Sequence, residues 1–254
     1  MNHVKLAETL DLACLNAKAT PQISSTQSLT LEESYLIQDL SIARRIYDRG
    51  EKRVGIKLGF TSKAKMEQMG VHDMIWGILT DQMQYDAGSA VTRKKFIHPR
   101  AEPEIAFRVK HDIHDVVTID NAQDFVSGVA VAIEIIDSRY ENFKFSLEDV
   151  IADNCSSAGF TLGEWKSPDT NIVNILMSLV KDDTIVGSGN SNAILGNPWE
   201  SFVAGARLAK ASGLQLRKDD IILAGAATPA TYINEGEVIS AFADGLGSVY
   251  LDVE

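Results

Sequence analysis

Short β-rich runs, broken by glycine, proline, aspartate and asparagine, fill the chain from about residue 90 onward. Two helical patterns interrupt them, over 146–154 and 197–213, and strands outnumber helices without alternating with them. A doubly wound parallel sheet requires regular alternation, so this order argues against that architecture. We predict an α+β fold around a strongly bent mixed sheet or barrel. The expected strands are AVTRKKFIHP, EIAFRVK, VAVAIEIID, AGFTLGEW, NIVNILMSLV, TIVGSG, IILAGA and SVYLDV.

The first 50 residues carry helical patterns instead. Apolar residues recur at helical spacing from Leu6 to Ala17, which predicts one amphipathic helix. A second helix is predicted to begin at Thr30, which can form a capping box with Glu33. Gly50 is expected to end it.

A short strand over 53–60 and a short helix over 61–70 are expected to join this part to the β-rich remainder. No change of composition separates the segments. We therefore expect a single domain over 1–254, with a helical N-terminal layer over 1–50 and a mixed β core over 51–254. The helical layer could also form a small subdomain.

Charge and cysteine content narrow the function classes. A formal net charge of −11 and a sequence pI near 4.9 argue against nucleic acid and against anionic membranes as partners. The two cysteines, Cys14 and Cys155, show no CxxC or disulfide-rich spacing, which suits a reducing compartment. The chain has no apolar run of about 18 residues and no signal-peptide pattern at its start. We therefore expect a soluble cytoplasmic protein.

Three glutamates occupy strand positions where apolar side chains are expected. Glu102 and Glu104 are two residues apart in RAEPEIAFRVK, so on a strand both point to the same face. Pro103 between them donates no ladder hydrogen bond, which predicts a strand start or edge where a site can open. Glu134 lies alone inside the apolar run VAVAIEIID. A charge buried there is costly unless it is paired or bound to a metal.

The chemistry of these glutamates favours a divalent metal. Carboxylate oxygens without histidine or cysteine suit Mg²⁺ or Mn²⁺ better than zinc. The Cα atoms of Glu102 and Glu104 are expected roughly 6.6 Å apart, which two glutamate side chains can span. In the alternative interpretation both glutamates line a solvated face with basic partners such as Arg100. Sequence spacing alone does not show that the strand of Glu134 lies beside the strand of Glu102 and Glu104. Both interpretations therefore stay open at this point.

Four stretches of the sequence are similar to one enzyme family. They are GIKLGFTSKAKMEQMGV, WGILTDQM, AEPEIAF and AIEIIDSRYENFKFSLEDVIADNCSSAGFTLG. In order and spacing they resemble the fumarylacetoacetate hydrolase superfamily. More narrowly, they resemble its branch of 4-oxalocrotonate decarboxylases and 2-keto-4-pentenoate hydratases from aromatic meta-cleavage pathways. The similarity runs from Glu33 to GLGSVYLDV near the end of the sequence, and SRYENFKF and KAKMEQM are closer to the decarboxylases.

The resemblance implies a set of site residues. Glu102, Glu104 and Glu134 match the family's three metal-binding glutamates, and the implied ion is magnesium or manganese. Lys57 matches the catalytic-site lysine of the family's G-x-K-x-G strand. Asp81 matches an aspartate that the family uses near the reaction.

The resemblance also implies a substrate contact and shows two departures. Ser156, after ADN, falls where the family contacts the substrate carboxylate. Trp76 stands where tyrosine is common, and LAGAATPA replaces a more usual segment with TGG. Gly225 and Thr228 of that segment remain, but the contacts expected of a second glycine are in question.

Lys57, Asp81 and Ser156 each have an ordinary structural interpretation as well. Lys57 could be a strand-end lysine facing water. Asp81 could be a turn residue, and Ser156 could cap a helix or turn. Of the two basic residues that follow Glu134, Arg139 and Lys144, neither is assigned to the substrate, and ion pairs with Asp137 and Glu141 are expected instead.

The implied activity is that of a lyase, a metal-dependent carboxy-lyase. It would convert 2-oxo-3-hexenedioate to 2-hydroxypenta-2,4-dienoate and CO₂. The electrons that CO₂ leaves behind flow to the C2 oxygen, where a divalent ion acts as a Lewis acid. Lys57 could donate to that oxygen or to the C1 carboxylate, or transfer a proton. A strong cation at the distal carboxylate would stabilise the substrate and oppose reaction, so weak or apolar surroundings are expected there.

Two other functions remain open from the sequence. The sister hydratase reaction would add water to 2-hydroxypentadienoate (2-oxopent-4-enoate) with the same ion and glutamates. A non-catalytic partner that stabilises an active paralogue belongs to a different class, although the retained lysine and glutamates argue against it. The resemblance further implies a homo-oligomer and an association with the sister hydratase.

Overall fold

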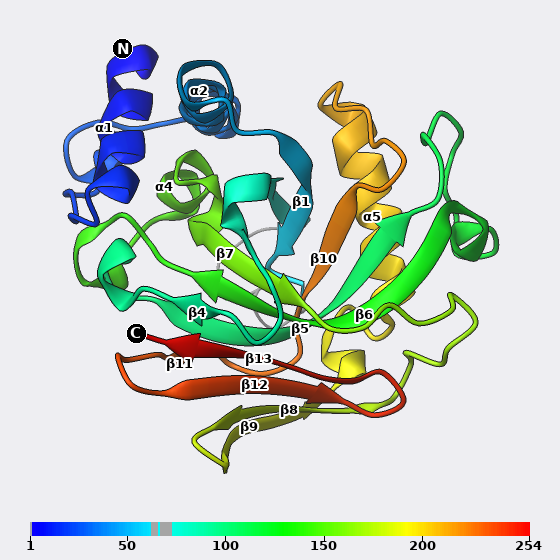
Figure 1. The fold of residues 1–254 in the computed structure, drawn as a ribbon. Helices are drawn as coiled ribbons and strands as arrows, with labels where there is room; N and C mark the ends of the chain where they lie inside the picture. Colours follow the sequence, from blue (N-terminus) through cyan, green and yellow to red (C-terminus); the bar gives the residue numbers. More distant parts are fainter. Residues whose placement is uncertain (1, 62–65, 67–72) are drawn as a thin grey trace.

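The computed structural model describes residues 2–61, 66 and 73–254, and it consists of two stacked β-sheets with helices at the N-terminal side (Figure 1). Within these residues the larger sheet has the strand order β2-β1-β10-β5-β6-β7-β3, with β11 paired to β5, and the smaller one has β4-β13-β12-β8-β9. The strands of the larger sheet are β1 (Arg53–Gly59), β2 (Ile75–Thr80), β3 (Gln84–Tyr85), β5 (Arg100–Val109), β6 (Val126–Ile136), β7 (Ser157–Leu162), β10 (Ile221–Ala226) and β11 (Thr231–Tyr232). Those of the smaller sheet are β4 (Ala90–Val91), β8 (Leu176–Lys181), β9 (Thr184–Asn190), β12 (Val238–Ala243) and β13 (Gly247–Val253).

Both sheets mix parallel and antiparallel pairs. β1 runs parallel to β10, β3 to β7 and β4 to β13, whereas β5, β6 and β7 form antiparallel pairs. The larger sheet curls around one end of the molecule (Figure 1). The prediction of an α+β fold with a bent mixed sheet and N-terminal helices is confirmed.

The N-terminal layer consists of α1 (His3–Leu15) and α2 (Leu31–Arg49), which pack against each other. α2 begins and ends as predicted: Thr30 and Glu33 form the capping box, and Gly50 ends the helix in the left-handed region at φ 72°. The layer reaches the β core through α2, because the buried Gln38 donates hydrogen bonds of 3.0 and 3.1 Å to the carbonyl oxygens of Trp76 and Ile151.

In the described part of the chain two further helices lie on the β core, and their predicted caps are confirmed. α4 (Leu147–Ala152) begins at Ser146, and α5 (Pro198–Ala211) begins at Asn197 with proline at its first position. α5 packs against β1 and β10. The helix expected over 61–70 falls largely outside the described residues.

The strand expected over 90–99 is mostly wrong. Only Ala90–Val91 is strand, and a 3₁₀ turn over Arg93–Lys95 follows it. The backbone N–H groups of Ile97 and His98 each donate a 2.7 Å hydrogen bond to the Asp137 carboxylate. A side chain distant in sequence thus takes the place of a strand partner, which local propensity cannot reveal.

The main core lies between the two sheets and buries the middle of the larger one. Phe107 of β5 and Val131 of β6 belong to the same apolar cluster as Ala241 and Leu251 of the smaller sheet. β6 is buried along almost its whole length, so Glu134 lies inside the protein with none of its surface exposed. Among the described helices, none is both long and apolar enough to cross a lipid bilayer.

Candidate active site

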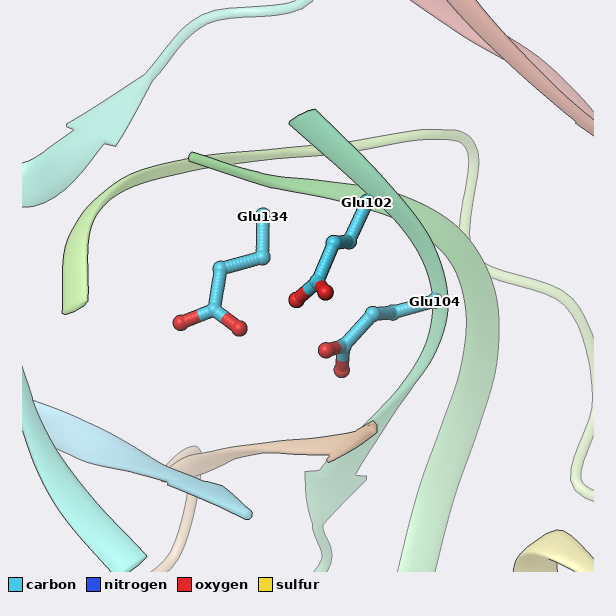
Figure 2. A group of neighbouring side chains, drawn as sticks. All are labelled: Glu102, Glu104 and Glu134. Atoms are coloured by element: carbon cyan, nitrogen blue, oxygen red, sulfur yellow. The ribbon is translucent and has the colours of Figure 1, made fainter. Parts of the chain in front are cut away.

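Three glutamates converge where β5 and β6 pair. Glu102 and Glu104 point to the same face of β5, and Glu134 of β6 is the direct register partner of Glu102 (Figure 2). One carboxylate oxygen from each lies within 4.8 Å of the others. Glu104 and Glu134 are buried and Glu102 is half-buried. The structure therefore brings together the three glutamates that the sequence singled out and excludes a solvated strand face for the two buried ones.

The cluster fits a divalent cation by its chemistry. The Oε1 atoms of Glu104 and Glu134 are buried and accept no hydrogen bond from the described residues. Buried anionic oxygens without a hydrogen-bond donor destabilise the folded protein, and a cation that binds oxygen ligands would offset this destabilisation. An all-carboxylate set is the kind that Mg²⁺ and Mn²⁺ prefer.

The loop that departs from the family pattern supports this cluster. The backbone N–H of Gly225 donates a 2.7 Å hydrogen bond to Oε2 of Glu104. Gly225 has φ 108°, and a Cβ there would lie 2.1 Å from Oγ1 of Thr61, so no other residue fits without rearrangement. Burial, then the charges of Glu134 and Glu102, raise the pKa of Glu104 well above its ordinary value against the lowering effects of Lys57 and Gly225.

Lys57 reaches the cluster from β1, whose register pairs it with Leu223 of β10 and Gly77 of β2. Its Nζ lies 2.9 Å from Oε2 of Glu134 and forms an ion pair with it, without the angles of a directed hydrogen bond. The same Nζ donates a 3.2 Å hydrogen bond to the Cys155 carbonyl oxygen. Burial lowers the pKa of Lys57, but the charges of the three glutamates outweigh it and raise the pKa above the ordinary value. The predicted site lysine is therefore a buried cation at the cluster and not a lysine facing water.

A left-handed turn presents Ser156 to the same region. Asn154, Cys155 and Ser156 have φ of 50°, 52° and 57°, a run that non-glycine residues rarely adopt. The side chain of Asn154 anchors the turn, because it accepts from the Ile78 N–H at 2.7 Å and donates to the Ile78 carbonyl at 2.9 Å. The Ser156 hydroxyl is buried and makes no hydrogen bond to the described residues.

A cavity of about 720 Å³ adjoins these groups, within the range of small-molecule sites. One part of its wall is polar and contains Lys57, Glu102 and Ser156. Another part is apolar and aromatic: Phe60, Ile75, Ile136, Phe143, Phe145 and Val150. The mixture suits a small acid with a hydrocarbon middle.

Two residues considered in the sequence lie elsewhere. Asp81 follows the end of β2, does not line the cavity, and accepts a 2.9 Å hydrogen bond from the Lys52 N–H. Arg139 is buried and forms its ion pair with Asp153, not with Asp137 or Glu141, the two partners expected for Arg139 and Lys144. Asp137 offers Arg139 only its carbonyl oxygen, at 2.6 Å. The buried guanidinium is thus satisfied away from the cavity.

The sequence reasoning missed Arg100 as a cavity residue. It lines the cavity wall, although the sequence suggested it only as a surface partner for the glutamates. The signal was present in the strand alternation, because R-x-E-x-E sets Arg100 on the same face as Glu102 and Glu104.

Comparison with known proteins assigns the class. The family model described as fumarylacetoacetate (FAA) hydrolase C-terminal matches residues 58–254. The chain belongs to the fumarylacetoacetate hydrolase family, and its fold is the one that the family shares.

Within the family the chain is most informatively compared with three proteins. It is 46% identical to a 4-oxalocrotonate decarboxylase of Pseudomonas sp, over 96% of this chain and 95% of the relative. It is 32% identical to a 2-hydroxyhexa-2,4-dienoate hydratase of Comamonas testosteroni, over 90% of this chain and 88% of the relative. The solved structure of a 4-oxalocrotonate decarboxylase from Pseudomonas putida G7, complexed with magnesium and adipate, matches with a TM-score of 0.94 and 33% identity, over 100% of this chain and 97% of that chain.

Proposed function

We propose that this protein is a metal-dependent 2-oxo-3-hexenedioate (4-oxalocrotonate) decarboxylase, which releases CO₂ and 2-hydroxypenta-2,4-dienoate. The observation that carries the proposal is the cluster of three glutamates within 4.8 Å on a cavity of small-acid size. The 46% identity to a protein of that activity supports the same substrate.

We assign Glu102, Glu104 and Glu134 as the ligands of Mg²⁺ or Mn²⁺. The magnesium complex of the related Pseudomonas putida G7 enzyme supports the choice of ion. When bound, the ion would supply Lewis acidity for the negative charge that collects on the C2 oxygen as CO₂ leaves. The N–H of Gly225 holds Oε2 of Glu104, which would leave the other oxygen of that carboxylate free to bind the ion.

Lys57 and Ser156 then act on the substrate itself. The Lys57 ammonium is held between Glu134 and the Cys155 carbonyl, so it can donate to the C1 carboxylate or C2 oxygen without reorganising. The buried Ser156 hydroxyl offers a second donor to the same carboxylate. The predicted catalytic role of Asp81 stays a prediction, because its carboxylate is bonded to the Lys52 N–H outside the cavity wall.

The apolar wall favours release of CO₂. Phe143, Phe145 and Ile136 solvate a carboxylate poorly and neutral CO₂ well.

A direct assay tests the proposal. Purified protein is given 2-oxo-3-hexenedioate with and without Mg²⁺, and CO₂ release and dienoate absorbance are followed. We expect metal-dependent CO₂ release, reduced by at least about 100-fold in Glu104→Gln, because that change removes a buried ligand charge. The exposed Glu164 gives a matched control, and Glu164→Gln should retain full activity. CO₂ release without metal, or at wild-type rate in Glu104→Gln, would contradict the proposal.

The second candidate function is hydration of 2-hydroxypentadienoate, and the 32% identity to a hydratase favours it. Consumption of that dienoate without CO₂ release from the diacid would select it. A non-catalytic partner role is disfavoured by the buried Lys57 and the intact glutamate cluster. Metal binding without turnover of either acid would select that role.

We further propose that residues 1–254 act as one catalytic domain and assemble as a homo-oligomer in the cytoplasm. The hydrogen bonds of Gln38 to the β core support one domain, and the free thiols of Cys14 and Cys155 suit the cytoplasm. Val238, Phe242 and Tyr250 lie on one face of β12 and β13 with exposed side chains, and such an apolar face suits a subunit contact. Light scattering measures the mass, and co-purification tests a complex with the sister hydratase.

A further inference from the structure

Lys57 and Arg100 are the cationic side chains that line the cavity among the described residues. Arg100 begins β5, two positions before Glu102 and four before Glu104. Because alternate residues of a strand share a face, the strand presents a row of one cation followed by two carboxylates. The cation stands at the end of this row away from Glu104.

Two aromatic rings hold the guanidinium of Arg100. Its Cζ lies 4.0 Å from the ring centroid of Phe143 and 4.3 Å from that of Tyr232, and its Nη2 donates a 2.6 Å hydrogen bond to the Tyr232 hydroxyl. Among the described residues no carboxylate forms an ion pair with it. The side chain is therefore fixed in position while its charge stays available to an anion.

One donor of this guanidinium lacks an acceptor. Nε of Arg100 is buried and makes no hydrogen bond to the described residues. A buried donor in that state is unfavourable, and a carboxylate is the acceptor that a guanidinium binds best. Arg100 thus has the chemistry of a subsite for a second acidic group.

We propose that Arg100 binds the distal carboxylate of the substrate and so selects 2-oxo dicarboxylic acids over 2-oxo monocarboxylic acids. The inference rests on the proposed function, which puts the 2-oxo acid end of the substrate at the glutamate cluster. The carboxyl carbons of an extended six-carbon diacid are roughly 6 Å apart, from C–C bonds of about 1.5 Å. The Cα atoms of Arg100 and Glu102 are separated by roughly 6.6 Å along the strand, so the length of such an acid matches the spacing of Arg100 from the nearest glutamate of the row.

The same contacts make this a weak clamp, as decarboxylation requires. The guanidinium of Arg100 already makes cation–π contacts with the rings of Phe143 and Tyr232, which partly satisfy its charge. Binding to the carboxylate is lost as its charge leaves, so Arg100 assists substrate binding and not the chemical step. Its removal should therefore raise KM and leave kcat unchanged or higher.

Calorimetric titration tests the inference with two probe acids. 2-Oxohexanedioate carries a carboxylate at the end where 2-oxohexanoate carries a methyl group, and the two acids are otherwise the same. Neither has the double bond that carries electrons from the leaving CO₂ to the C2 oxygen, so neither should be decarboxylated during the titration. With Mg²⁺ present, wild type should bind the diacid at least about 10-fold more tightly than the monoacid, and Arg100→Met should remove that preference. Binding of the monoacid by Arg100→Met should stay within about two-fold of wild type, which also shows that the variant is folded.

Arg108 supplies the matched control. It lies on the same strand, stacks on the ring of Trp165 at 4.9 Å and bonds to Ser127, but it does not line the cavity. Arg108→Met should leave both dissociation constants unchanged. In turnover of 2-oxo-3-hexenedioate, Arg100→Met should raise KM by about the same 10-fold without lowering kcat.

The outcomes separate this inference from the function on which it rests. If wild type binds neither acid in a metal-dependent way, the proposed function fails and the inference fails with it. If wild type binds both acids equally well, or Arg100→Met weakens both equally, the inference alone is overturned. A lower kcat at unchanged KM would also overturn it.

Discussion

At the scale of single residues, two neighbouring serines test the proposed substrate contact of Ser156. The hydroxyls of Ser156 and Ser157 are both buried and both lack a hydrogen-bond partner among the described residues, but only Ser156 lines the cavity. We expect Ser156→Ala to raise KM by about 10-fold, the cost of one hydrogen bond to a charged group. Ser157→Ala should leave KM unchanged, and steady-state kinetics measures both. An equal rise in the two variants would show that the effect comes from the fold of the turn.

The sequence predicted local features of the candidate site better than the contacts between its strands. Strand alternation is local, so it predicted that Glu102 and Glu104 share a face. Their meeting with Glu134 depends on the register of β5 and β6, which is set by packing over the whole sheet and could not be read from spacing. Asp81 came from the resemblance alone, and its carboxylate instead bonds to the backbone at Lys52.

At the scale of elements, helix caps were predictable and the irregular strands were not. Thr30, Glu33 and Gly50 act within one turn of their helix, so the sequence carries the whole signal. The segment after Val91 leaves the sheet because the distant Asp137 binds its N–H groups. Local patterns thus predict elements whose hydrogen bonds are local.

The ion pairs between α1 and α2 predict that the stability of the fold depends on pH. The Asp11 carboxylate of α1 is buried and bonds to Arg44 at 3.0 Å and to Arg49 at 2.5 and 2.9 Å. Burial raises the pKa of Asp11, but the arginines outweigh it and the pKa falls below the ordinary 3.8. A lowered native pKa stabilises the fold above pH about 4, and that contribution is lost as the pH falls through the lower native value.

Asp11→Asn removes this contribution. We expect the variant to lose about 1–3 kcal/mol of unfolding free energy at pH 7, since a buried charge-assisted network is broken. Its stability should also fall less steeply than that of wild type below pH about 4. Urea unfolding at several pH values measures both effects, with Asp48→Asn on the exposed side of α2 as the control. Parallel pH profiles for Asp11→Asn and wild type would contradict this account.

At the scale of the whole molecule, the glutamate cluster concentrates unfavourable charge in the core of the larger sheet. Glu104 and Glu134 have 1% and 0% of their surface exposed, and β5 and β6 on which they lie pair along most of their length. Carboxylates buried to this extent lower the free energy of unfolding unless a cation balances their charge. If the proposed ion binds there, it links the site to the stability of the fold.

This coupling predicts that Mg²⁺ stabilises the protein. An ion that binds the native cluster and not the unfolded chain adds about 2.7 kcal/mol at a concentration of one hundred times its Kd. For a chain of this length that corresponds to a rise in Tm of roughly 5–10 °C, which EDTA should reverse. Calorimetry measures the shift without any assay of activity. Glu134→Gln should abolish the shift, whereas Glu164→Gln, at an exposed glutamate paired with Lys166, should retain it. An equal Mg²⁺ shift in the two variants would mean that the ion binds elsewhere, and the assignment of the cluster as the metal site would be wrong.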